Sequence, residues 1–129
     1  MSTGFPAATG DVVSANMWNG LVTYAINAQT GTSYTLVLGD SYQTLITQSN
    51  ASANAIKIPT NATAAIPIGS VITIMNIGAG TCTVSAVTSG TTTVLSAGAT
   101  PAQPTILQYR SVALIKVLSD TWYVVGSCA

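Results

Sequence analysis

The sequence predicts an all-β protein: an antiparallel β-sandwich or a jelly-roll-like barrel, preceded by a short N-terminal arm with one short helix. Short runs rich in Val, Ile and Thr fill the chain from Ser33 onward, and Gly, Pro, Ser or Asn separates them, a pattern typical of sandwiches and barrels. The length of 129 residues suits one such domain. We therefore expect an arm at residues 1–32 and a β-domain at residues 33–129.

The arm is predicted to contain one short helix. Ser14 can cap its N-terminus, and Met17, Trp18 and Leu21 follow at helical spacing. Gly20 lies inside this pattern and weakens a helix by about 1 kcal/mol relative to Ala. A short helix of this kind needs a surface on which to dock.

Four apolar residues of the arm are therefore candidates for contact with another chain. The segment before the helix carries a single aromatic residue, and the segment 27–32 after it reads as a linker. Large apolar side chains on an arm too short to bury them often mark an interaction site. The partner-binding hypothesis names Phe5, Met17, Trp18 and Leu21.

The β-domain is predicted to contain nine strands. Its last two form the clearest hairpin, because Ser119 and Asp120 make a short polar connection between two apolar runs. In this hairpin Trp122 is expected in the core and Tyr123 on the outside. No clean internal repeat is evident. The predicted strands are Tyr34–Leu38, Thr44–Gln48, Ala55–Ile58, Val71–Ile77, Thr81–Val87, Thr92–Leu95, Ile106–Tyr109, Val112–Leu118 and Trp122–Val125.

Charge is nearly absent from this chain. It has three basic and three acidic residues and no His, and no charged residue lies between Lys57 and Arg110. Globular proteins carry roughly a quarter charged residues, and charged side chains normally protect the edges of sheets from pairing with other chains. The composition therefore favours association with copies of the same chain. It also excludes nucleic-acid binding, which needs clustered Lys or Arg.

The residues needed for catalysis are missing. Gly39-Asp40-Ser41 resembles the nucleophile segment of lipase-like hydrolases, but such a serine needs a base, normally His. We interpret the segment as a turn between strands. The three acidic residues are far apart in the sequence. Asp11 lies near the start of the predicted helix, and Asp40 and Asp120 lie in predicted turns, so structural roles are expected for all three. The sequence predicts no enzyme and no catalytic residue.

No cofactor or metal site is expected either. Without His, a zinc site would need several Cys residues, and the chain has only Cys82 and Cys128. Two distant cysteines without a secretion signal are expected to be reduced thiols. The most apolar segment, residues 64–77, is interrupted by Pro67 and Gly69 and is too short for a spanning helix. No membrane association is expected.

Several segments together resemble a small β-domain of tailed-bacteriophage virion proteins. The two segments nearest the C-terminus form the strongest part of this resemblance, which covers about residues 33–127. The opening segment Gly10–Asn19 also resembles the start of phage structural proteins. The segments within the domain are Tyr34–Asp40, Ile66–Ile74, Gly78–Val84, Gln108–Val117 and Asp120–Gly126.

This resemblance implies a non-enzymatic component of the virion surface, typically a homotrimer. The sequence has no long shaft, coiled-coil heptad or collagen-like tract, so a capsid decoration (cement) protein fits better than a tail fibre. Such a protein would be made in the host cytoplasm, bind the major capsid protein on the head exterior and stabilise the capsid lattice. The alternative is a receptor-binding tail-fibre or head-fibre protein that contacts host-surface glycans. A cellular or secreted β-sandwich module is a third possibility.

Overall fold

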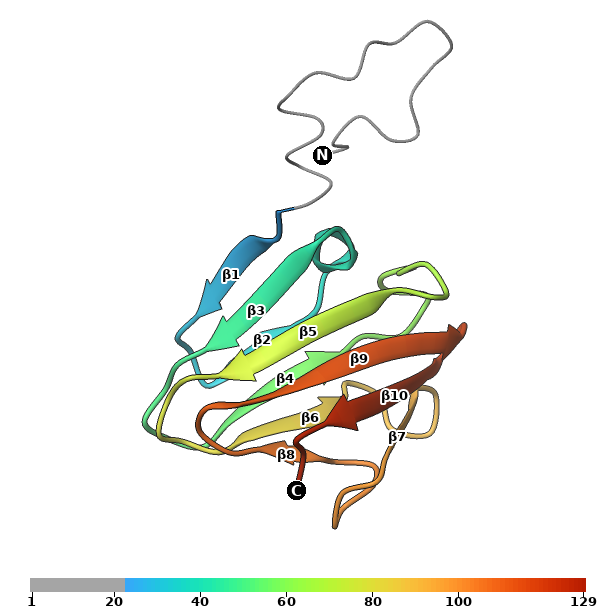
Figure 1. Ribbon diagram of the computed structural model, residues 1–129. Coiled ribbons are helices and arrows are strands. Elements are labelled where there is room, and N and C mark those ends of the chain that lie inside the picture. The colour runs from blue at the N-terminus through green and yellow to red at the C-terminus, as the bar shows by residue number, and fades with distance from the viewer. Residues whose placement is uncertain (1–22) are drawn as a thin grey trace, which may run out of the picture.

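The computed structural model describes residues 23–129, and these residues form an all-β structure (Figure 1). The predicted helix at residues 14–25 begins outside the described residues, and Ala25 belongs to a strand. One 3-10 turn, Leu38–Ser41, is the only helical element of the described part. The strands are β1 (Ala25–Gln29), β2 (Ser33–Thr35), β3 (Thr44–Gln48), β4 (Asn54–Ile58), β5 (Val71–Asn76), β6 (Cys82–Ala86), β7 (Thr93–Ser96), β8 (Thr105–Ile106), β9 (Arg110–Leu118) and β10 (Thr121–Gly126).

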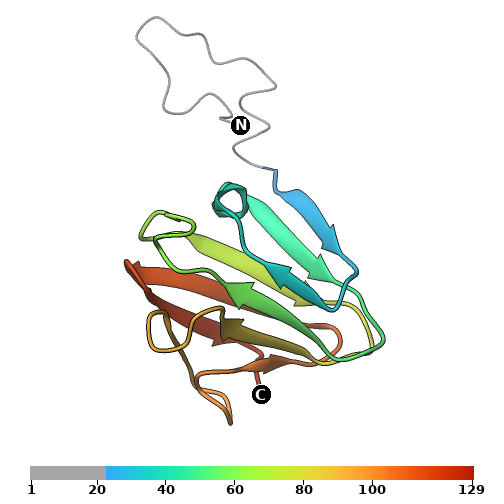
Figure 2. The same cartoon turned by 180° about the vertical axis from the view of Figure 1, so that it is seen from behind.

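The strands form two mixed sheets. The larger sheet has the order β1-β3-β5-β9-β10-β7 and the smaller sheet has the order β2-β4-β6-β8. Figures 1 and 2 show the two sheets from opposite sides. Five of the pairings are parallel and three are antiparallel. The all-β prediction is confirmed, whereas the prediction of an antiparallel arrangement is wrong.

The parallel pairing arises because the chain alternates between the sheets. The strands β1, β3 and β5 lie side by side in the larger sheet, and β2, β4 and β6 lie side by side in the smaller one. Each pair β1–β2, β3–β4 and β5–β6 therefore forms one coil of a short parallel solenoid. The antiparallel hairpin β9–β10 then adds to β5 and carries β7 on its far side.

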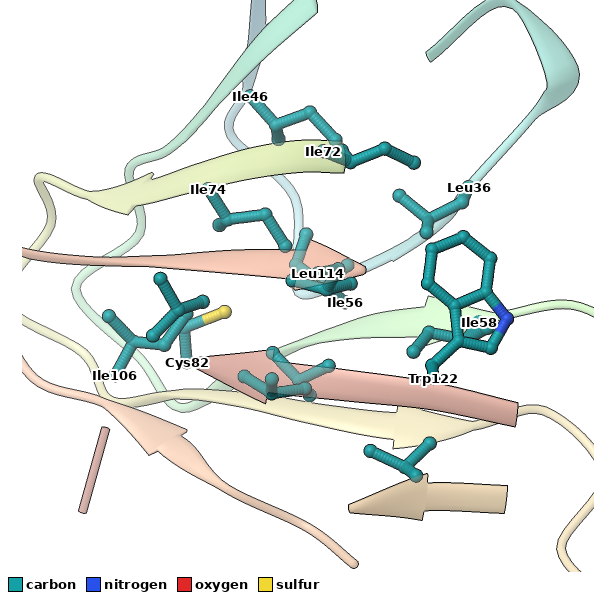
Figure 3. Packing of buried hydrophobic residues seen from close by; sticks show 14 of the residues in the cluster. Leu36, Ile46, Ile56, Ile58, Ile72, Ile74, Cys82, Ile106, Leu114 and Trp122 are labelled. Atoms are coloured by element: carbon teal, nitrogen blue, oxygen red, sulfur yellow. The ribbon is translucent and has the colours of Figure 1, made fainter. Parts of the chain in front are cut away.

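Buried side chains from both sheets form one apolar cluster (Figure 3). Alternate residues of β3, β4 and β5 are buried, as the period-two geometry of a strand requires. Trp122 in β10 is 1% exposed and Tyr123 is 43% exposed, so their predicted orientations are confirmed. Cys82 lies in the same cluster, and both Cys82 and Cys128 are free thiols.

A row of amide side chains marks the corner where each coil leaves the larger sheet. Gln29, Gln48 and Asn76 occupy equivalent positions at the ends of β1, β3 and β5. The Gln48 side chain donates to the Gly31 carbonyl (2.6 Å), and that of Asn76 donates to the carbonyls of Gly80 and Ile106 (2.9 and 2.8 Å). These bonds satisfy backbone groups that the corners would leave unpaired. The row repeats in the structure, although no clean repeat is evident in the sequence.

The structure also differs from the prediction of a linker at residues 27–32. Asn27 to Gln29 are part of β1, which pairs in parallel with β3. The predicted boundary at residue 32 therefore falls after a strand of the larger sheet. The reason is that β1 pairs through its backbone, while four of its five side chains are small or polar and Ile26 alone gives no strand pattern.

Candidate functional site

The four residues proposed for partner binding, Phe5, Met17, Trp18 and Leu21, lie outside the described residues. Their role stays a prediction. The described part of the chain offers a different candidate, which is the face of the larger sheet that points away from the core. We call this surface the outer face. Its side chains come from alternate positions of the six strands.

The outer face consists of three rows that cross the sheet. One row runs from Ile26 on β1 to Val125 on β10, and a second runs from Val71 on β5 to Leu95 on β7. The third row begins at Ala28. In full, the rows are Ile26, Leu45, Thr73, Ala113 and Val125; Val71, Ile115, Tyr123 and Leu95; and Ala28, Thr47, Met75 and Ser111.

Several apolar side chains of this face are open to solvent. Ile26 is 61% exposed, Val71 is 53% exposed and Val125 is 45% exposed. A shallow depression of about 430 Å³ adjoins Val71, and Tyr24, Tyr42 and Ile68 are among its lining residues. Contiguous apolar patches of this kind mark interaction sites more often than scattered apolar residues do.

No charged side chain of the described residues lies on the outer face. Asp40 and Lys116 are buried, and Lys57 lies on the smaller sheet, where its ammonium donates to Ser85 Oγ (2.9 Å). Arg110 begins β9 at the corner edge, and Asp120 lies in the turn between β9 and β10. The outer face can therefore pack against another surface without removing charges from water.

The Gly39-Asp40-Ser41 segment forms the predicted turn. Ser41 Oγ donates to the Leu38 carbonyl (2.7 Å). Asp40 is buried, and its carboxylate accepts bonds from the Tyr34 hydroxyl (2.6 Å), the Asn27 amide (3.0 Å) and a backbone N–H. Burial, together with the hydrogen bond to Asp40, raises the pKa of Tyr34 to about 12. This arrangement closes the core beside β1 and β2 and has a structural role.

Lys116 is the second buried charged residue, and strand alternation could have revealed it. It has the same parity as Val112 and Leu114 on β9, which both point inward. Its ammonium donates to Asn61 Oδ1 (2.8 Å) and to the Ile66 carbonyl (2.7 Å). Burial lowers the pKa of Lys116, while the charge of Asp120 opposes this shift. Lys116 thus anchors the loop between β4 and β5 to the core.

The described residues contain no group of three or more His, Cys, Asp or Glu side chains that could hold a metal ion. Within residues 23–129, no helix has the length and apolar character needed to cross a bilayer. A comparison with protein-family models, curated proteins and solved structures finds no match to this chain.

Proposed function

We propose that this protein is a non-enzymatic virion structural protein of a tailed bacteriophage. In this proposal it is a capsid decoration (cement) protein that assembles as a homotrimer on the head exterior. The observation that carries the assembly role is the uncharged, partly exposed outer face of the larger sheet. The phage setting and the trimer follow from the sequence resemblance and are tested separately below.

The edges of the sheets support self-association. The outermost strands of the larger sheet are β1 and β7, and those of the smaller sheet are β2 and β8. None of these four strands contains a charged residue. Edge strands usually carry charges, bulges or prolines that prevent pairing with other chains. Contact with copies of the chain would explain why these four edge strands carry no charged residues.

The occupant of the outer face is a second copy of this chain. The formal net charge is zero, so copies do not repel one another strongly. The face itself combines apolar side chains with Thr and Ser hydroxyls, which can be buried without the large desolvation penalty of ions. On a capsid lattice, several weak contacts made by one trimer would add up to high avidity.

Placing a charge on the outer face tests this proposal. Ile115 lies between Val71 and Tyr123 in the second row, and Ile115→Lys would place a cation in the interface. We expect sedimentation velocity to show a trimer for the wild type and at least about a tenfold weaker association for the variant, which corresponds to about 1.4 kcal/mol or more.

Thr83→Lys is the matched control because it adds the same charge to the other sheet. Thr83 is half-buried on β6 and pairs with Ala55 and Thr105. This variant should assemble like the wild type. A monomeric wild type, or equal association of the two variants, would contradict the proposed interface.

The virion setting is tested by the copy number per particle. Quantitative mass spectrometry of purified virions should find hundreds of copies, in a near-stoichiometric ratio to the major capsid protein. A handful of copies would place the protein on the tail or at a vertex. Its absence from particles would overturn the virion proposal and leave the self-association result to stand alone.

One observation favours the alternative role of a receptor-binding fibre protein. Tyr109 is 78% exposed and has a φ of 63°, a backbone conformation that bulky residues rarely adopt. It precedes the exposed Arg110. Unusual backbone conformations concentrate at functional sites, and an exposed aromatic ring beside an arginine suits contact with a glycan. A low copy number per particle would favour this role.

A further inference from the structure

Three segments distant in the sequence meet around the buried ammonium of Lys116. Lys116 lies on β9 and is 1% exposed, and its Nζ is 2.8 Å from Oδ1 of Asn61. Asn61 follows β4, and its backbone N–H donates to Oδ1 of Asp120 (2.9 Å) in the turn between β9 and β10. The ring of Trp122 covers the ammonium at 5.8 Å from its centroid. An amine and a carboxamide are thus held together at a partly buried site.

We propose that Lys116 and Asn61 form an intramolecular isopeptide bond. The new bond joins Nζ of Lys116 to Cγ of Asn61, and the bond between Cγ and Nδ2 of Asn61 breaks. This inference concerns a covalent modification and does not depend on the proposed assembly function. It gives Lys116 a chemical role in addition to its role in anchoring the loop between β4 and β5.

The reaction needs no co-reactant. The Lys116 ammonium first loses a proton to solvent, and the lone pair of the neutral amine attacks Cγ of Asn61. A second proton moves from the attacking nitrogen to Nδ2, the tetrahedral intermediate collapses, and ammonia leaves. Ammonia takes up a proton from solvent, so that one ammonium ion is released and the protons balance. No atom is oxidised or reduced.

Burial favours the first of these steps. A buried ammonium is penalised relative to the neutral amine, and the neutral amine is the nucleophile. The pKa of Lys116 is lowered by this burial, although the charge of Asp120 acts in the opposite direction. The carboxylate of Asp120 accepts from the backbone N–H of Asn61, so we assign it the role of positioning Asn61 beside the amine.

The geometry also holds both reactants in place. The backbone of Lys116 is bonded on both sides, since its N–H donates to the Ser70 carbonyl (3.1 Å) and its carbonyl accepts from Gly69 (2.7 Å). Asn61 is held by Asp120, which also accepts from Thr92 Oγ1 (3.2 Å). Reactants fixed in this way react far faster than the same groups in solution.

The other lysine provides an internal comparison. Lys57 lies on the smaller sheet and points away from the core, because Ile56 and Ile58 on either side are buried. Its ammonium donates to the Ser85 hydroxyl and has no carboxamide partner among the described residues. Of the two lysines in the chain, only Lys116 combines burial with an adjacent Asn.

The bond would tie the loop between β4 and β5 permanently to β9. Lys116 and Asn61 are 55 residues apart in the sequence, so the link would close a long loop of the chain. Closing such a loop restricts the unfolded chain and so favours the folded state. A particle protein that lacks disulfides would gain a covalent brace from this single bond.

Mass spectrometry of the folded wild-type protein tests the proposal directly. The intact mass should be lower than the calculated mass by one ammonia molecule. Trypsin cleaves after Lys57, Arg110 and Lys116, the only basic residues of the chain. With the bond present, cleavage after Lys116 is blocked, and peptide 58–110 stays joined to peptide 111–129 after digestion.

The peptide map excludes other losses of ammonia. Asn19-Gly20 can lose ammonia by cyclising to a succinimide, but this change would leave the tryptic peptides separate. A full intact mass, or ammonia loss with peptides 58–110 and 111–116 separate, would overturn the proposal. Joined peptides with the mass of one ammonia missing would establish the bond.

Two variants test the roles of Asn61 and Asp120 in forming the bond. Asn61→Asp offers a carboxyl group in place of the carboxamide, so a bond formed there releases water rather than ammonia. Its joined peptide should have the same mass as that of the wild type, while the intact mass should be one water below the mass calculated for the variant. Asp120→Ala removes the acceptor that holds Asn61, so less of the bond should form and a larger share of the protein should show the full intact mass. Normal bond formation in Asp120→Ala would overturn the role assigned to Asp120.

Discussion

At the residue scale, two buried charged groups organise the ends of this structure. The carboxylate of Asp40 accepts bonds from Tyr34, Asn27 and a backbone N–H. The ammonium of Lys116 bonds Asn61 and a carbonyl. Buried charges are costly unless hydrogen bonds compensate them. Each group therefore fixes the loop that supplies its partners.

The raised pKa of Tyr34 predicts a loss of stability at alkaline pH. The phenol titrates near 10 in the unfolded chain and near 12 in the folded one. Between these values the folded state keeps a proton that the unfolded state has lost, so the free energy of unfolding falls as the pH rises from about 10 to about 12. Tyr34→Phe should remove this part of the slope in urea unfolding curves.

The same variant should also lower stability at neutral pH. Tyr34 is half-buried and donates to a carboxylate, so loss of its hydroxyl should cost about 1.5 kcal/mol. Tyr109→Phe is the control, since Tyr109 is strongly exposed. Identical alkaline slopes for the wild type and Tyr34→Phe would show that Tyr34 has no shifted pKa.

At the scale of elements, the coils depend on close contact between successive corners. Gly80 donates its N–H to the Asn50 carbonyl (2.8 Å). A Cβ at Gly80 would collide with the backbone of Ser52, and one at Gly78 would collide with the backbone of Asn50. The two corners can stack because these glycines leave room for the neighbouring backbone.

Gly80→Ala should therefore destabilise the protein. The collision involves backbone atoms that cannot move independently, and we expect a loss of about 1–3 kcal/mol in the free energy of unfolding. Gly39→Ala is the matched control, because a Cβ at Gly39 meets nothing within 4 Å. Thermal or urea unfolding measures both. Equal stability of the two variants would show that the corners are not tightly stacked.

Seven of the nine predicted strands lie at the positions of observed strands, because β-branched residues concentrate in them. The predicted strand Tyr34–Leu38 shares only its first two residues with β2 and runs into the 3-10 turn, and Ile106–Tyr109 shares only Ile106 with β8. β1 escaped prediction because its sequence is Ala-Ile-Asn-Ala-Gln, with no β-branched run. The direction of pairing could not be predicted, since the inward and outward alternation of a strand is the same in parallel and antiparallel sheets.

The repeat was hidden by irregular spacing. Gln29, Gln48 and Asn76 occupy one row of the larger sheet, but 19 and then 28 residues separate them in the sequence. The corner from β3 to β4 and the corner from β5 to β6 stack on each other. The loops that return to the larger sheet differ in length, which obscures any fixed period.

The candidate site was predictable only in part. The scarcity of charge indicated an associating surface, but not which surface, because the strand order determines which side chains share a face. The row from Ile26 to Val125 joins strands from both ends of the chain. Alternation could have placed Lys116 inward, whereas its partner Asn61 lies 55 residues away in a loop and has no sequence signal.

At the scale of the whole molecule, the two sheets differ in the surfaces they present. The smaller sheet points the charged side chain of Lys57 away from the core. The larger sheet presents the outer face, on which no described residue is charged and several apolar side chains are exposed. This asymmetry is the basis for assigning the assembly role to the larger sheet.

Hydroxyl-radical footprinting as a function of protein concentration tests this central claim most directly. Tyr123 lies on the outer face and Tyr109 lies at the far corner, and both are exposed in the single chain. We predict that Tyr123 becomes protected from oxidation as the protein associates, while Tyr109 stays reactive. Equal reactivity of Tyr123 in dilute and associated protein would contradict the account, because the outer face would then remain uncovered.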